Sequence, residues 1–120
     1  MNIEALPKLL VPALLFTFAS CSMREQPAAG ATGAEIYKAS ACATCHGEDL
    51  SGTGLAPTLV GLSANWTPDA LAKFLGSPDP ARVRSSRQAK LDLEFSADMP
   101  TYDNLSAEEL IRLAGFLLAE

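Results

Sequence analysis

The stretch that most constrains this 120-residue chain is Cys42-Ala43-Thr44-Cys45-His46. Two thiols separated by two residues can reach one edge of a macrocycle, and a histidine directly after the second thiol can reach a metal at its centre. This C-x-x-C-H pattern is typical of covalent haem attachment through two thioether bonds. We therefore predict that Cys42 and Cys45 bind one haem c and that His46 ligates its iron.

Two other kinds of site use the C-x-x-C spacing. A redox-active dithiol is expected in a strand–helix setting, and no βαβ pattern surrounds these cysteines. A structural zinc site needs four ligands, whereas the whole chain has three cysteines and one histidine. Both remain alternatives, but haem attachment best explains why the single histidine directly follows the second cysteine.

The first twenty residues have the features of an export signal. Residues 9–19 form an apolar run that only Pro12 and Thr17 interrupt. The run is shorter than the roughly 20 residues that a membrane-spanning helix needs, and it has the length of the apolar region of a signal peptide. We predict that residues 1–20 direct the chain out of the cytoplasm, where c-type haem is attached.

The end of this run, Phe18-Ala19-Ser20-Cys21, resembles the lipobox of bacterial lipoproteins. The resemblance implies that Cys21 is acylated and anchors the protein at a membrane, on its periplasmic or outer side. Residues 21–31 then form a polar, flexible tether with a reach of roughly 20 Å, and residues 32–120 form the folded domain. The alternative is ordinary cleavage after Ala19, which would leave Cys21 as a free thiol.

The charge of the chain argues against one class of partner. Nine Lys and Arg stand against 14 Asp and Glu, a net charge of −5, whereas a nucleic-acid-binding domain usually presents a basic face. We therefore expect no nucleic-acid partner. One stretch concentrates positive charge, at Arg82, Arg84, Arg87 and Lys90. It could steer an acidic partner or neutralise haem propionates, or it could be a solvated loop or short helix without a partner.

Local signals predict three helices. Thr32 with Glu35, and Ser106 with Glu109, have the spacing of capping boxes, which mark helix starts. The stretch after Ser106 also has an apolar stripe with helical spacing, at Leu110, Leu113, Ala114 and Leu117. Between these two helices, Thr67 is a good N-cap for a helix that ends at Gly76.

The chain from about Gly33 to Glu120 resembles the class I (monohaem) cytochromes c. The resemblance rests on the C-x-x-C-H motif, on Pro57-Thr58-Leu59-Val60-Gly61-Leu62, and on Met99-Pro100. It implies an all-α fold in which the N- and C-terminal helices cross. In that family a glycine, here Gly33, allows the close crossing, and an aromatic residue near Phe116 packs there.

The same resemblance implies an environment for the iron. The Pro57 carbonyl accepts a hydrogen bond from His46, which orients the imidazole. Of the three methionines, Met1 and Met23 precede the domain, and Met99 lies where the family has its distal ligand. Ligation by histidine and methionine raises the reduction potential and closes the iron to small molecules. Trp66 is either a core aromatic or a contact to the haem.

The resemblance implies a one-electron carrier and no enzyme. The sequence also contains no phosphate loop, metalloprotease helix or hydrolase elbow. The expected partners are redox proteins that dock transiently outside the cytoplasm. One alternative is a fixed haem subunit of a larger membrane-associated oxidoreductase. Another is a ligand-binding or peroxidatic haem protein, which would need an open sixth position at the iron.

Overall fold

The computed structural model describes residues 25–77 and 86–120, and within these ranges the chain has helices and loops but no strand. The predicted all-α fold is therefore confirmed. The α-helices are α1 (Gly33–Ala39), α2 (Ala43–His46), α3 (Pro68–Gly76), α4 (Ser86–Glu94) and α5 (Ala107–Leu118), and a short 3-10 helix, η1 (Leu62–Ala64), precedes α3. The predicted signal sequence, Cys21, Arg82 and Arg84 lie outside the described residues. None of the helices described is long and apolar enough to cross a bilayer.

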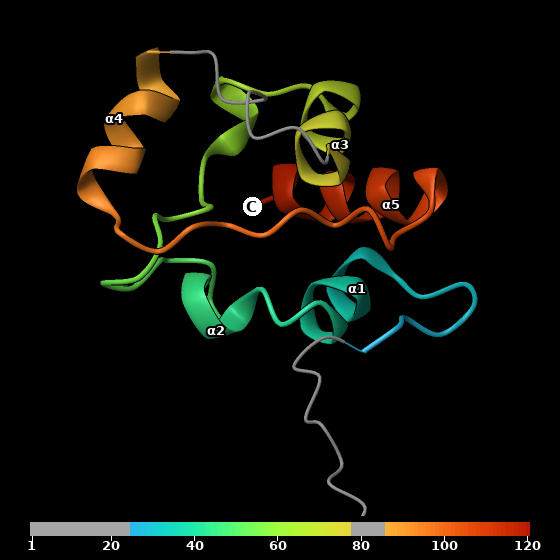
Figure 1. Cartoon of the computed structure of the whole chain (residues 1–120). Coiled ribbons are helices and arrows are strands. Elements are labelled where there is room, and N and C mark those ends of the chain that lie inside the picture. Colours follow the sequence, from blue (N-terminus) through green and yellow to red (C-terminus); the bar gives the residue numbers. More distant parts are fainter. Residues whose placement is uncertain (1–24, 78–85) are drawn as a thin grey trace, which may run out of the picture.

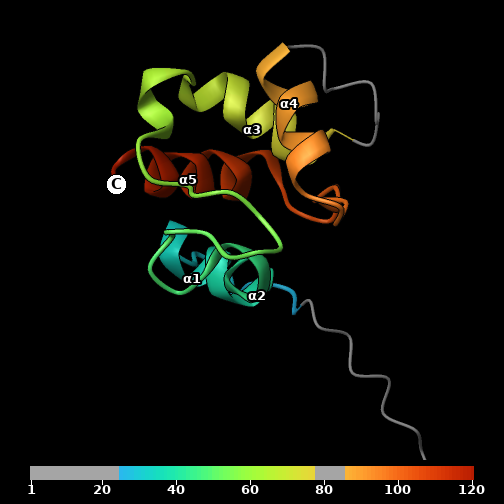
Figure 2. The ribbon, with the colours of Figure 1, turned by 90° about the vertical axis from the view of Figure 1, so that its left-hand side faces the viewer.

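Helix α5 forms the middle of the fold. In Figures 1 and 2 it lies between α3 on one side and α1 on the other, with α2 next to α1. The two largest fully buried side chains, Ile36 of α1 and Leu113 of α5, belong to one core cluster. Apolar burial along one face of α5 therefore holds the helices together.

The helix starts predicted from the sequence are confirmed. The Thr32 hydroxyl accepts from the Glu35 amide at 3.3 Å, and the Glu35 carboxylate accepts from the Thr32 amide at 2.7 Å. Ser106 and Glu109 make the same reciprocal pair, at 3.2 and 2.8 Å. Thr67 caps α3 by accepting from the Ala70 amide at 3.3 Å. Each cap satisfies amides that have no partner within the helix.

Helices α1 and α5 cross where Gly33 has no side chain. A Cβ atom at this position would collide with the Arg112 carbonyl oxygen and with the Phe116 Cβ, both on α5. The ring of Phe116 packs against Tyr37, with centroids 5.8 Å apart and planes inclined by 56°. Gly33 and Phe116 therefore lie at the crossing, as the family resemblance implies.

The segment before α1 differs from the predicted flexible tether. Residues 25–31 contact the domain, because the Glu25 amide donates to the Ala39 carbonyl at 2.9 Å, and both Pro27 and Ala31 are buried. The sequence of this segment has no apolar period that would indicate packing. We call residues 25–31 the N-terminal strap.

We predict that Gly33→Ala lowers the stability of the haem-loaded protein by about 1–3 kcal/mol, because the added methyl group forces α1 and α5 apart. Thermal unfolding followed by circular dichroism measures the change.

Gly115→Ala is the matched control, since a Cβ on Gly115 meets nothing within 4 Å. Both substitutions gain helix propensity, so the difference between them isolates the collision. A midpoint for Gly33→Ala equal to that of Gly115→Ala would contradict the close crossing.

Candidate functional site

Helix α2 carries the C-x-x-C-H motif in a single helical turn. The His46 amide donates to the Cys42 carbonyl at 2.9 Å, so the last residue of the motif lies one helical turn above the first. Cys42 and His46 are buried and Cys45 is partly exposed, and no disulfide bond joins the two cysteines. The turn from α1 into α2 passes through Ala41, whose φ of 58° is in the left-handed region that a residue with a side chain rarely adopts.

The imidazole of His46 is oriented by a backbone carbonyl. Its Nδ1 lies 2.8 Å from the Pro57 oxygen, and because a carbonyl only accepts, Nδ1 carries the hydrogen. Nε2 is then the nitrogen with the free lone pair, as a metal ligand requires. Burial lowers the pKa of His46, while the bond to Pro57 acts in the opposite direction. The ring is therefore neutral near pH 7.

A folded loop, residues 47–61, holds Pro57 in this position. The Gly52 amide donates to the His46 carbonyl at 2.8 Å, and the Thr53 hydroxyl donates to the Cys45 carbonyl at 2.6 Å. Gly52 has a φ of 84°, and a Cβ there would press on the backbone of Pro57 and Thr58. The absence of a side chain at Gly52 thus permits a close approach of two backbone segments.

The residue after the motif is held by α1. The Tyr37 hydroxyl donates to the Gly47 carbonyl at 2.7 Å, and Tyr37 is 5% exposed. Burial is the main cause that raises the pKa of Tyr37 to about 12, and the negative charges of Glu48 and Asp49 act in the same direction. Tyr37 therefore stays protonated and can donate over the whole physiological range.

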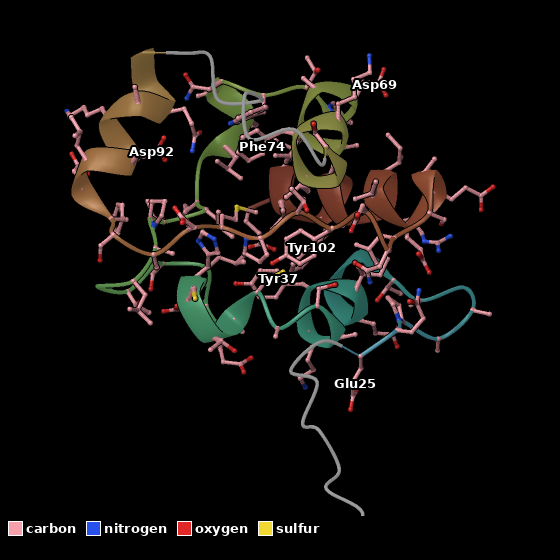
Figure 3. All side chains as sticks on the ribbon, viewed as in Figure 1. Glu25, Tyr37, Asp69, Phe74, Asp92 and Tyr102 are labelled. Carbon is pink, nitrogen blue, oxygen red and sulfur yellow. The ribbon has the colours of Figure 1, made fainter. Side chains whose placement is uncertain are left out.

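Two adjoining cavities, of about 250 and 180 Å³, open against the motif. Residues that line both are Cys42, His46, Pro57, Gln88, Leu91 and Met99. The larger cavity also reaches Cys45, and the smaller one extends into the core as far as Trp66 and Leu113. Figure 3 shows the labelled Tyr37 and Tyr102 between α1 and the segment that leads into α5. The two thiols, the imidazole and a thioether thus share one hollow.

The structure brings together every predicted site residue that it describes. Met99 is partly buried on the segment between α4 and α5, and it lines both cavities. Trp66 lines the smaller cavity and packs against Phe74, with ring centroids 5.0 Å apart. Trp66 is therefore both a core aromatic and a wall of the hollow. Cys21 lies outside the described residues.

One wall of the hollow was not predicted from the sequence. Helix α4 and the residue that follows it contribute Gln88, Leu91, Asp92 and Phe95 to the larger cavity. These positions have the i, i+3, i+4, i+7 spacing of one helical face. The spacing could have indicated a helix, but two of its four residues are polar, which weakens the apolar period. Lys90 does not line either cavity.

A family model described as Cytochrome c matches residues 30–119, a range that includes each helix in the described part of the chain. Searches of curated proteins and of solved structures found no match. Proteins of the matched family bind one haem c, with its iron, covalently. They generally carry electrons, and their domains typically lie outside the cytoplasm.

The residues of the hollow fit haem c. Both thiols lie outside any disulfide bond and belong to one helical turn, and His46 has its Nδ1 hydrogen-bonded to the Pro57 carbonyl. The smaller cavity is lined largely by apolar side chains, as a macrocycle with apolar faces requires. Among the described residues, no group of three or more His, Cys, Asp or Glu is gathered to hold a metal ion.

We predict that Tyr37→Phe destabilises the protein by about 1 kcal/mol, because the Gly47 carbonyl loses its donor. Its effect should depend on pH. An unfolded tyrosine titrates near 10 and folded Tyr37 near 12, so the unfolded chain loses this proton first as the pH rises. The contribution is complete below pH 10 and declines between pH 10 and 12.

Urea unfolding of wild type and Tyr37→Phe at pH 7 to 11 measures both effects. The free energy of unfolding of wild type should fall more steeply above pH 10 than that of the variant. Parallel curves would show that Tyr37 titrates normally.

Proposed function

The chain belongs to the cytochrome c family, and from this premise we propose that it carries single electrons on a haem c whose iron is ligated by His46 and Met99. The thioether bonds are assigned to Cys42 and Cys45. The partners are redox proteins outside the cytoplasm, which dock briefly and leave. That the family generally carries electrons supports the class of function, and the residues of the hollow support the ligand assignment.

The observation that carries the proposal is the bond between His46 and Pro57. A buried imidazole whose Nδ1 donates to a carbonyl at 2.8 Å offers its Nε2 as a ligand in a fixed orientation. Met99 lines the same two cavities as His46 but comes from a different part of the chain. A thioether is a soft ligand without charge, and it suits an iron that stays closed to oxygen.

Haem c supplies a one-electron couple at its iron. The chain holds the ligands in place and keeps water away from the haem. His46 and Met99 keep the same positions in both oxidation states, held by the loop 47–61 and by the segment before α5. Apolar side chains such as Leu62, Leu71 and Leu113 exclude water from the inner wall, which lowers the local dielectric constant and so influences the reduction potential.

We predict that Met99→Ala removes the weak far-red sulfur-to-iron absorption band and converts the low-spin iron to a form that binds carbon monoxide when reduced. The reason is that the alanine leaves the sixth position without its thioether. Absorption spectra of the purified haem-loaded protein, oxidised and reduced, measure this.

Met23→Ala is the matched control, because Met23 is the only other methionine beyond the predicted signal sequence. Its spectrum should equal that of wild type. If wild type itself binds carbon monoxide rapidly at neutral pH, the sixth position is open and a ligand-binding function replaces electron transfer. A stable stoichiometric partner after mild solubilisation would instead identify a fixed subunit.

We also propose that Cys21 is acylated and anchors the domain at the membrane. Cys21→Ser should then move the haem-loaded protein from the membrane fraction to the soluble fraction, with an unchanged absorption spectrum. Fractionation of cells followed by haem staining measures the distribution. If the variant stays in the membrane fraction, the lipid anchor at Cys21 is disproved.

A further inference from the structure

We propose that the domain is held against the bilayer by its α1 side, because the N-terminal strap leaves only three residues between Cys21 and the folded part. The occupant of this face is the lipid headgroup layer. The inference rests on the lipid anchor proposed above, and it adds what that anchor alone does not give, namely which face of the domain meets the membrane.

The strap is fixed at both of its ends. At the start, the Glu25 amide donates to the Ala39 carbonyl at 2.9 Å, and the Gln26 side chain donates to the Asn104 carbonyl at 3.5 Å. At the other end, Ala31 is 5% exposed and belongs to the core cluster. The strap therefore runs back along α1, and the chain joins the fold at Glu25.

Chain length then limits the distance to the membrane. Ser22, Met23 and Arg24 separate Cys21 from Glu25, so the Cα atoms of these two end residues lie at most about 14 Å apart. A free tether over residues 21–31 would have allowed more than twice that distance at full extension. The domain consequently stays at the headgroups and pivots about one point.

That point lies close to the haem-binding motif. Glu25 is hydrogen-bonded to the last residue of α1, and Cys42 is three residues further along the chain, at most about 11 Å away. Figure 3 shows the labelled Glu25 directly below α1, on the side of the fold where α2 also lies. The membrane attachment and the motif are thus on one side of the domain.

The face around this point suits contact with a neutral headgroup layer. Its exposed residues are small or of mixed charge: Glu25, Gln26, Ala28, Ala29, Gly30, Ala34, Glu35 and Lys38. Among these exposed residues there is no bulky apolar side chain that would insert into the acyl region of the bilayer. The covalent anchor, and no inserted side chain, therefore holds this face at the membrane.

The test uses the acylated, haem-loaded full chain on phosphatidylcholine vesicles that carry a fluorescent dye on the headgroups. Haem quenches the dye by energy transfer, which falls steeply with distance. A Gly-Ser segment of about ten residues inserted between Arg24 and Glu25 should reduce the quenching by about twofold, since it adds roughly 17 Å of reach. The same segment added after Glu120 is the matched control and should leave the quenching unchanged.

A second measurement checks the strap itself. In native-state hydrogen exchange the Glu25 amide should be protected, because it is bonded to Ala39, whereas the exposed Ala29 should exchange fast. Equal quenching with and without the insertion, a rapidly exchanging Glu25 amide, or loss of the protein from the vesicles would each overturn the proposal. None of these results would alter the spectrum of Met99→Ala, so electron transfer is tested separately.

Discussion

The close approach of α1 and α5 at Gly33 is the contact on which the rest of the structure depends. Helix α5 holds α3 on its other side, and α2 follows α1 after a short turn through Ala41. A displacement of α1 would therefore move the motif that follows it, and with it the Tyr37 hydroxyl that holds Gly47. The position of the hollow thus depends on the crossing of α1 and α5, although neither helix carries a proposed iron ligand.

Much of this architecture could be predicted because its signals are local. The capping boxes at Thr32 and Ser106 need only residues three apart, and both helices begin where those residues place them. The C-x-x-C-H motif likewise fits within one helical turn. The approach of Pro57 to His46 spans eleven residues, and it was expected only because the segment around Pro57 resembles a known family.

Two parts could not be predicted, and both depend on contacts between distant segments. The face of α4 that lines the hollow contains Gln88 and Asp92, so the apolar period of this helix is weak. The helix lines the same cavity as the C-x-x-C-H motif, which is distant in the sequence. The N-terminal strap consists of small and polar residues, and its first contact is a backbone bond from Glu25 to Ala39 that almost any residue could make. A backbone hydrogen bond of this kind cannot be predicted from the pattern of side chains.

The loop after α2 has a consequence for the speed of electron transfer. Its bonds to the carbonyls of Cys45 and His46 tie it to the same turn that carries the imidazole. These bonds join neutral backbone and hydroxyl groups, so they do not respond strongly to one unit of charge gained or lost nearby. In the proposed carrier, these bonds restrain the groups around the imidazole when the charge of the iron changes. For the electron transfer proposed above, such restraint implies a small reorganisation energy, so that a modest driving force is enough for rapid exchange.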